Sequence, residues 1–222
     1  IQSFLPVADE IVIGIDDKTD DNSEEIARRY SDDVFKFKWE KSFCKARNTC
    51  MERCKSDWIF MTEGHEYLAD SSYSVMPKIG QLPPIVSMVS VRRVLENGKH
   101  SEFPWITRNN CGIRYVFDSH NVPISSNPVC NLTVVCKEIM TVHKRSDERE
   151  EARRAQRKYM NKENFLKELM KNPRSSRALF YLGNEYHDFG EYEKAIKYYE
   201  RYLGVSDWAE ERYQVKIFYA RC

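Results

Sequence analysis

The sequence has no long apolar segment and no excess of charge of either sign. A membrane-spanning helix needs about 20 consecutive apolar residues, and the apolar runs of this chain are far shorter. Lys plus Arg total 35 and Asp plus Glu total 34, so no bulk field attracts nucleic acid or an anionic membrane. We therefore expect no membrane partner, and the balanced charge disfavours a nucleic-acid adaptor.

Paired metal-binding cysteines are also lacking. The chain has seven cysteines, an odd number, without two C-x-x-C pairs. Cys50 and Cys54 share a helix face, but nothing supplies the second half of a tetrahedral zinc shell, so buried free thiols are favoured. This cysteine usage indicates a reducing, cytoplasmic compartment. No charged-then-apolar leader opens the chain at Ile1, and we expect an N-terminal piece with a first strand to precede it.

The apolar runs, helix caps and turns of the sequence predict an α/β fold. The apolar run at 10–15 predicts a buried strand, and Ser23 begins a short helix after a turn rich in Asp and Asn. Residues 34–37 then predict a strand, Ser42 caps a helix that extends to about Cys54, and 58–62 predict a further strand. From Pro84 onward, alternation at 85–91 and a turn at 96–99 indicate a mixed, partly antiparallel region. Alternating strands and helices favour an α/β sheet.

The C-terminal part predicts helices. Residues 146–170 are charged with a sparse apolar stripe, and residues 176–206 have small and aromatic residues at the spacing of a tetratricopeptide repeat. These are Leu182, Gly183, Tyr186, Gly190, Tyr192, Ala195, Tyr199 and Tyr202. Because a single repeat cannot bury its own face, it should dock on the preceding helix or on a partner chain, including a second copy. We place the domains at 1–144 and 145–222.

One short motif predicts a cation-binding site. An apolar strand leads into Glu63-Gly64-His65, and residues i and i+2 of an extended segment point the same way. Open α/β sheets bind ligands at the carboxyl ends of their strands. Glu63 and His65 could therefore converge on one cation, although such a pair also arises by chance on a surface.

Taken in order, the motifs resemble the family 2 glycosyltransferases of the GT-A fold, in members that carry tetratricopeptide repeats after the catalytic domain. The resemblance rests on the segments 6–13, 16–23, Phe43–Asn48, Ser56–Ile59, Arg108–Tyr115, His120 and His143. The sequence departs from the family where an Asp-x-Asp motif becomes Glu63-Gly64-His65, and where a glycine-rich turn becomes Asp17-Lys18-Thr19.

The resemblance implies a Rossmann-like mixed sheet with a tetratricopeptide-like extension. The implied activity is a metal-dependent, inverting transfer of a sugar from a nucleotide-diphosphate donor. A UDP-sugar is the favoured donor. The acceptor would be a peptide, a glycan or a modified nucleobase. A divalent ion stabilises charge on the leaving diphosphate, and imidazole with carboxylate suits Mn²⁺, with Mg²⁺ as the alternative.

The resemblance also suggests residues for each role. The metal ligands would be Glu63, His65 and His143, and the donor-binding residues would be Asp16, Lys41, Arg47 and Asn48. The base candidates are Asp118, His120 and Glu66. Structural roles stay open for several of them: Asp16 as a cap, Arg47 in a salt bridge and His143 in packing. The alternative function is a non-catalytic binding module on the same fold, whose repeat recruits a protein partner.

Overall fold

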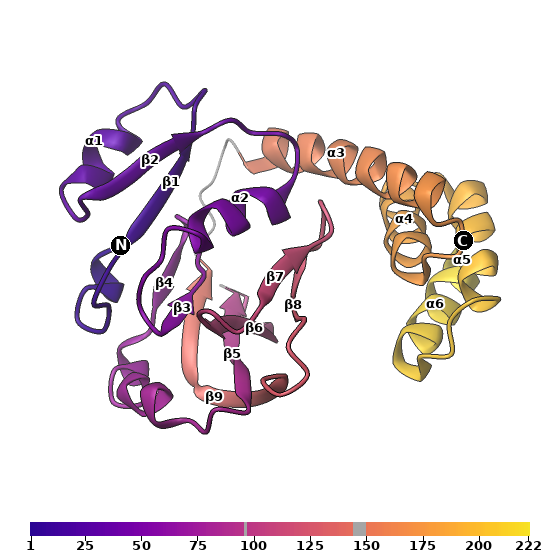
Figure 1. Ribbon diagram of the computed structural model, residues 1–222. Coiled ribbons are helices and arrows are strands. Elements are labelled where there is room, and N and C mark those ends of the chain that lie inside the picture. Colours follow the sequence, from indigo (N-terminus) through magenta and orange to yellow (C-terminus); the bar gives the residue numbers. More distant parts are fainter. Residues whose placement is uncertain (96, 144–149) are drawn as a thin grey trace. The chain divides into compact units, whose positions relative to one another are not determined.

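The computed structural model describes residues 1–95, 97–143 and 150–222. It divides into two compact units, Ile1–Asp147 and Glu148–Cys222. The first unit mixes strands and helices, and the second unit is helical (Figure 1). The expected α/β class with a mixed sheet and C-terminal helices is confirmed. The boundary expected at 144/145 falls outside the described residues.

A small parallel sheet begins the first unit. Strand β1 (Val12–Asp16) pairs with β2 (Asp33–Phe37), and helix α1 (Ser23–Arg28) connects them. Ile15, Ala27 and Val34 form the small core between this helix and the two strands. Both strands expected from the apolar runs are therefore present, and their parallel pairing is connected by a helix, as parallel neighbours require.

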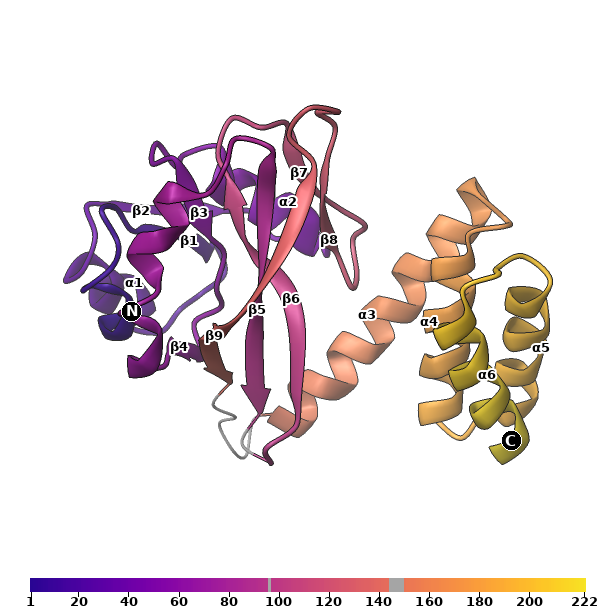
Figure 2. The same cartoon turned by 90° about the horizontal axis from the view of Figure 1, so that it is seen from below.

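The larger sheet has five strands in the order β3-β6-β5-β9-β4. They are β3 (Trp58–Phe60), β4 (Glu66–Leu68), β5 (Val86–Leu95), β6 (His100–Arg108) and β9 (Leu132–His143). Strands β5 and β9 run parallel, whereas the other neighbours are antiparallel. Figure 2 shows the long strands β5, β6 and β9 side by side. At their centre Val89, Val91 and Ile139 have no exposed surface.

The turn expected between β5 and β6 is confirmed. Leu95 N donates to Lys99 O at 2.8 Å, and Gly98 adopts a positive φ of 77°. Such a φ costs glycine little because it has no Cβ. The short 3₁₀ segments Gln2–Phe4, Asp70–Ser72 and Met76–Gln81 lie outside the sheets.

The strands do not all belong to one sheet. Within the described residues, β3 pairs with β6 alone, and β1 and β2 form a sheet of their own. Alternation of strands and helices predicts which segments are extended, but pairing depends on backbone hydrogen bonds between distant segments. Those bonds cannot be deduced from the local pattern.

Helix α2 (Phe43–Met51) packs beside the hairpin of β7 (Ile113–Val116) and β8 (Val122–Ser125). The Oγ of Ser42 accepts a hydrogen bond from Lys45 N at 3.2 Å, which confirms the expected N-cap. Such a cap satisfies a donor that the first turn of a helix leaves free. It fixes the start of the helix that carries Arg47 and Asn48.

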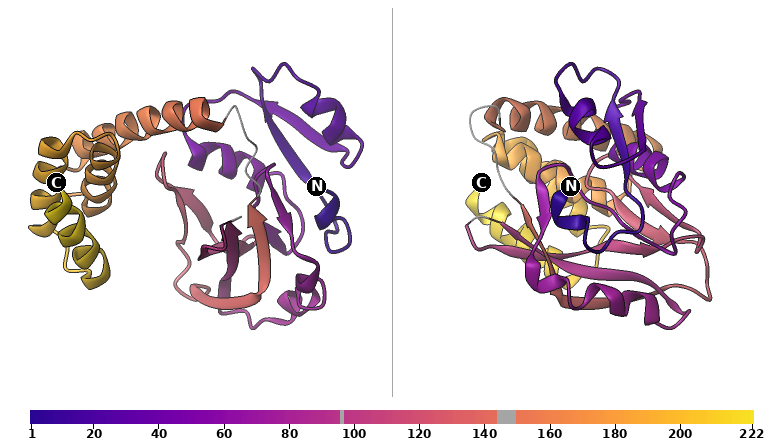
Figure 3. Two further views of the ribbon diagram at one scale, coloured as in Figure 1. Left: turned by 180° about the vertical axis from the view of Figure 1, so that it is seen from behind. Right: turned by 90° about the vertical axis from the view of Figure 1, so that its left-hand side faces the viewer.

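The second unit consists of α3 (Glu150–Lys171), α4 (Ser176–Asp188), α5 (Tyr192–Leu203) and α6 (Ala209–Arg221), seen from two more sides in Figure 3. A Cβ added at Gly183 of α4 would lie 2.5 Å from the Tyr199 ring of α5. Ala195 and Tyr199 are fully buried. The start of the expected long helix, 146–149, lies outside the described residues. No helix in the described part of the chain has the length and apolar composition needed to cross a bilayer.

Candidate functional site

Two histidines and one glutamate meet at the edge of the larger sheet. Glu66 on β4 lies opposite His143 on β9 in the antiparallel register, so the two side chains occupy the same face of the sheet. His65 directly precedes β4, and its ring centroid lies 4.2 Å from that of His143. Ligand atoms of His65, Glu66 and His143 all lie within 4.8 Å of one another.

The backbone at Glu63-Gly64-His65 differs from the sequence expectation. These residues form a turn rather than an extended strand, and Glu66 N donates to Glu63 O at 2.9 Å. The expected alternation of side chains therefore does not apply here. Glu63 Oε2 still lies 3.3 Å from His65 Nε2. However, the group that brings both histidines together contains Glu66, which we expected only as a base, and not Glu63.

Two atoms of the cluster lack hydrogen bonds. His65 Nε2 and Glu66 Oε1 are buried and have no hydrogen-bond partner in the described part of the chain. The other oxygen of Glu66 accepts from Glu63 N at 3.2 Å and from the Thr62 hydroxyl at 3.3 Å. Each of the two atoms still has a charged or ionisable neighbour, Arg93 Nε at 2.8 Å from Glu66 Oε1 and Glu63 Oε2 at 3.3 Å from His65 Nε2. Imidazole nitrogens and a carboxylate oxygen within 4.8 Å of one another suit a divalent transition metal.

Arg93 is a functional residue that sequence reasoning missed. From β5 its Nε lies 2.8 Å from Glu66 Oε1, and its Nη2 donates to His143 Nδ1. The Glu66 side chain is fully buried, so this guanidinium compensates a charge that water cannot reach. A neutral imidazole has only one acceptor nitrogen. If Nδ1 is the ligand atom, His143 can serve Arg93 or a metal ion, but not both at once.

The sequence contains a weak signal for Arg93. Arg92 and Arg93 end the apolar run of β5, and consecutive residues of a strand face opposite sides. One of two neighbouring arginines must therefore point toward the same face as the buried residues. The sequence does not show that this face leads to Glu66.

Arg47 holds Glu63 in place. Its Nη2 lies 2.5 Å from Glu63 Oε1, and its Nη1 donates to Asn121 Oδ1 at 3.0 Å. The guanidinium also stacks on Trp105 and Tyr115, with its carbon 4.6 and 5.2 Å from the two ring centroids. Only 12% of this side chain is exposed. The described contacts thus direct both outer nitrogens of Arg47 toward protein groups, as in the salt-bridge alternative.

The ion pair changes the acidity of Glu63. Burial raises the pKa of this carboxyl, but the positive charge of Arg47, together with those of His65 and Arg93, outweighs the effect. The pKa of Glu63 therefore lies below its usual range. Glu63 is an anion at neutral pH and adds negative charge beside the two histidines.

The other expected donor-binding residues are Asn48, Asp16 and Lys41. Asn48 donates to Tyr115 O and accepts from Tyr115 N, both at 2.9 Å, so its amide connects α2 to β7. Asp16 Oδ1 accepts from Lys18 N at 3.1 Å, which is a turn-capping bond. Lys41 is exposed and has a positive φ of 59°.

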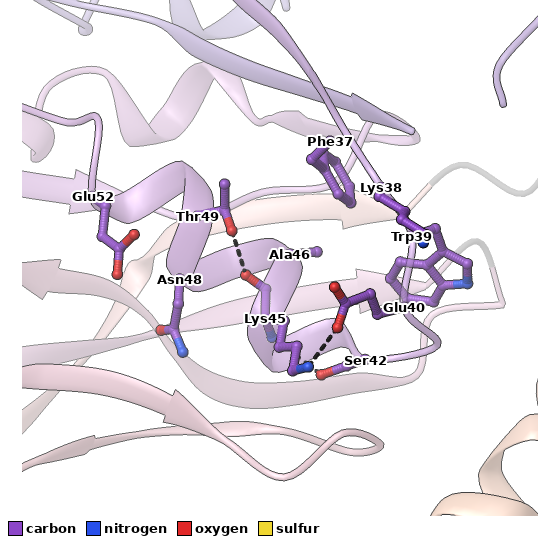
Figure 4. Close-up of a pocket in the computed structure, with 10 residues that line it drawn as sticks. All are labelled: Phe37, Lys38, Trp39, Glu40, Ser42, Lys45, Ala46, Asn48, Thr49 and Glu52. Atoms are coloured by element: carbon purple, nitrogen blue, oxygen red, sulfur yellow. Dashed lines mark hydrogen bonds and ion pairs between the residues drawn. The ribbon is translucent and has the colours of Figure 1, made fainter. Parts of the chain in front are cut away.

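Figure 4 shows a pocket of about 400 Å³ beside the start of α2, with Asn48 among its lining residues. Lys45 and Glu40 form an ion pair at its rim. Arg47 and the histidine cluster do not line this pocket. We therefore do not assign it to the site of the cluster.

A larger cavity of about 1290 Å³ reaches the cluster. Asp16, Glu63 and Glu66 line it, together with apolar residues of β1 and β3. Ligand sites of drug-sized molecules measure roughly 300–1,000 Å³, so this space admits a ligand of nucleotide size. Asp16 and Glu66, which are distant in sequence, thus line one cavity, whereas His65 and His143 are not among its lining residues.

The remaining base candidates lie in the turn between β7 and β8. Asp118 O accepts from Phe43 N at 3.0 Å, and Cys44 Sγ lies 3.6 Å from Asp118 Oδ1. His120 is exposed and has a positive φ of 47°. Asn121 of the same turn bonds Arg47. The turn is therefore connected to Glu63 through one arginine, while Glu66 belongs to the histidine cluster itself.

The chain matches a model of a known protein family. Residues 6–130, more than half of the chain, match the family model described as Glycosyl transferase family 2. No curated protein matches the chain significantly. The matched segment includes Glu63, His65 and Glu66 but ends before His143 and before the helical unit.

Proposed function

Because the chain belongs to glycosyl transferase family 2, we propose that it transfers a sugar from a nucleotide-diphosphate donor to an acceptor with inversion. A UDP-sugar is the first donor to test, and the acceptor is a peptide, a glycan or a modified nucleobase. The observation that carries the proposal is the group of His65, Glu66 and His143. Its glutamate lines a cavity large enough for a nucleotide.

The three grouped residues fit a divalent ion by their chemistry. Ligand atoms of His65, Glu66 and His143 lie within 4.8 Å of one another, and we assign these three residues as ligands. Glu63, 3.3 Å from His65 Nε2, is close enough to act through a bound water. When bound, Mn²⁺ or Mg²⁺ would supply a Lewis acid for the departing diphosphate.

Side chains of the protein would position Glu63, bind the nucleoside and remove the acceptor's proton. Arg47 fixes the Glu63 carboxylate by an ion pair and by stacking between two aromatic rings. Asp16 lies at the carboxyl end of β1 in the same cavity, where its free oxygen would accept from the nucleoside. Inversion needs a base that removes the acceptor's proton. With Glu66 assigned as a ligand, Asp118 is our first choice and His120 the second.

Donor hydrolysis tests this function. The protein is incubated with UDP- and GDP-sugars and Mn²⁺, and release of nucleoside diphosphate is measured with and without a chelator. We expect slow release that the chelator abolishes. His65→Ala should lose Mn²⁺-dependent donor binding, measured by calorimetry, whereas His100→Ala, an exposed residue of β6, should keep it.

The non-catalytic alternative makes the opposite prediction. No donor would be hydrolysed, and no nucleotide sugar would shift the melting temperature, with or without Mn²⁺. Unchanged Mn²⁺-dependent binding in His65→Ala would remove this histidine from the site even if the protein proves to be active.

For the helical unit we propose a tetratricopeptide-like role in binding a protein partner or a second copy. The close packing of Gly183 against Tyr199 supports this, as does the burial of Ala195. Trp208 and Tyr213 are 58% and 71% exposed at the start of α6, and aromatic residues are enriched at interfaces. Light scattering of the full chain at increasing concentration tests self-association, and Tyr213→Ser should weaken it.

A further inference from the structure

Two cysteines of the first unit lie in direct contact. Cys111 follows β6 and Cys130 precedes β9, and their Sγ atoms are 2.8 Å apart. This is closer than non-bonded sulfur atoms normally approach, although longer than the roughly 2.05 Å of a disulfide bond. Cys54, Cys136 and Cys222 instead donate to oxygen atoms.

The backbone around the two thiols is fixed by other contacts. The Ser125 hydroxyl lies 2.8 Å from Cys130 O and 3.3 Å from Cys111 O, so one side chain connects both loops. Cys130 N donates to Asn127 Oδ1 at 3.3 Å, and Ser126 N donates to Gly112 O at 3.1 Å. These bonds hold the sulfur atoms together without a covalent link, so forming one requires little backbone movement.

We propose that Cys111 and Cys130 are a reversible redox pair that forms an intrachain disulfide by exchange with a small-molecule disulfide such as oxidised glutathione. The inference does not depend on the proposed transferase activity. Because Cys130 is 5% exposed and Cys111 is more accessible, Cys111 is the thiol that a small disulfide reaches first.

The exchange has two steps. The Cys111 thiolate attacks one sulfur of oxidised glutathione, which forms a mixed disulfide and releases one glutathione thiolate. The Cys130 thiolate then attacks Cys111 Sγ, breaks the mixed disulfide and releases the second glutathione. The two protein thiols lose two electrons and two protons, and both electrons and both protons end on the two glutathione thiols.

The environment of the pair sets the rate. Burial and the neighbouring Cys130 thiol raise the pKa of Cys111 to about 11. Only the thiolate is nucleophilic, so exchange at pH 7 should be slow and should accelerate about tenfold per pH unit up to about pH 9. Cys111 should therefore resist brief oxidation but respond to a sustained oxidising environment.

The bond would close the open end of the β7–β8 hairpin. Cys111 and Cys130 flank the hairpin on its two sides, and its turn carries Asp118 and Asn121. A cross-link between the flanking loops restricts opening of the hairpin and stabilises the fold by restricting the unfolded chain. Oxidation would thus make the segment next to Arg47 more rigid.

Peptide mapping tests the pairing. The full chain is incubated at pH 8 with a series of ratios of oxidised to reduced glutathione, quenched with acid, alkylated and digested without reduction. We expect a linked peptide containing Cys111 and Cys130, which dithiothreitol abolishes. The melting temperature of the oxidised protein should exceed that of the reduced protein by about 5 °C or more.

Variants separate this bond from general oxidation. Cys130→Ser should lose both the linked peptide and the thermal shift and retain a mixed disulfide at Cys111. Cys136→Ser, which changes a half-buried thiol elsewhere, should behave as the wild type. The proposal is overturned if the folded wild-type protein shows no Cys111–Cys130 peptide after prolonged incubation in oxidised glutathione at pH 8, a result that requires no variant to fold.

Discussion

Arg93 of β5 contacts Glu66 of β4 although strand β9 lies between them in the sheet. The Arg93 Nε lies 2.8 Å from Glu66 Oε1, and the same guanidinium donates to His143 on the intervening strand. The candidate metal cluster therefore already contains an internal cation. A metal ion and Arg93 would compete for the same carboxylate.

This competition predicts the effect of Arg93→Met, which keeps the apolar part of the side chain and removes its charge. Glu66 would be left buried without a cation, and we expect a loss of about 3–5 kcal/mol in the free energy of unfolding without metal. Mn²⁺ affinity, measured by calorimetry, should rise at least tenfold. The matched variant Arg92→Met should change neither quantity comparably. Equal Mn²⁺ affinity in wild type and Arg93→Met would contradict the competition.

A second prediction concerns the pH dependence of the Arg47–Glu63 pair. The folded-state pKa of Glu63 is lowered from 4.5, so the unfolded state binds the proton more tightly. The pair therefore stabilises the protein fully above that value, and the contribution disappears as the pH falls through the lower, folded-state pKa. Glu63→Gln should be less stable than the wild type at pH 7, and the difference should shrink on acidification below about pH 4.5.

Urea denaturation at pH 7 and at pH 3.5 measures this difference. Glu52→Gln is the control, because Glu52 pairs with Arg114 at 3.4 Å and both side chains are more than half exposed. Exposed pairs contribute little, so Glu52→Gln should be close to the wild type at both values of pH. A constant difference between Glu63→Gln and the wild type across this range would refute the assignment.

A third prediction concerns Asn48, whose amide makes two 2.9 Å hydrogen bonds to the backbone of Tyr115. Asn48→Ala leaves a buried donor and a buried acceptor of β7 without partners, and should cost about 2–3 kcal/mol in the free energy of unfolding. Thr49→Ala removes a hydroxyl that bonds only the preceding turn of α2 and should cost less than about 0.5 kcal/mol. Chemical denaturation of both variants compares the two costs.

A fourth prediction concerns the helical unit. In Gly183→Ala the new methyl group would lie 2.5 Å from the Tyr199 ring. Overpacking of this kind costs about 1–3 kcal/mol, which exceeds the roughly 1 kcal/mol that alanine gains over glycine within a helix. Gly204→Ala meets no atom closer than 3.5 Å and should be nearly neutral. Helical melting by circular dichroism should separate the two variants, and equal melting would show that the helices can move apart at no cost.

Much of the local structure could be predicted from the sequence because local rules determine it. The cap at Ser42, the turn at Gly98 and the strand at Val86–Leu95 follow from side-chain chemistry and alternation within a few residues. The presence of Glu63 and His65 near the end of a strand could also be read from the sequence. Their backbone conformation could not, because a hydrogen bond between Glu66 N and Glu63 O forms a turn in place of the expected extended segment.

The site itself shows the limit of local reasoning. Glu66, Arg93 and His143 come from three strands, and only the order β5-β9-β4 brings them together. The sequence therefore indicated candidate residues by type, but not which of them meet. The contact between Cys111 and Cys130 likewise depends on both ends of a hairpin returning to one place.

The sequence by itself determined the α/β class and the helical C-terminal part. The tertiary structure decided which carboxylate joins the histidines, which arginine compensates it and which cysteines meet. The physical reason is that side-chain periodicity acts within one element, whereas strand order and register are set by backbone hydrogen bonds between segments far apart in the chain.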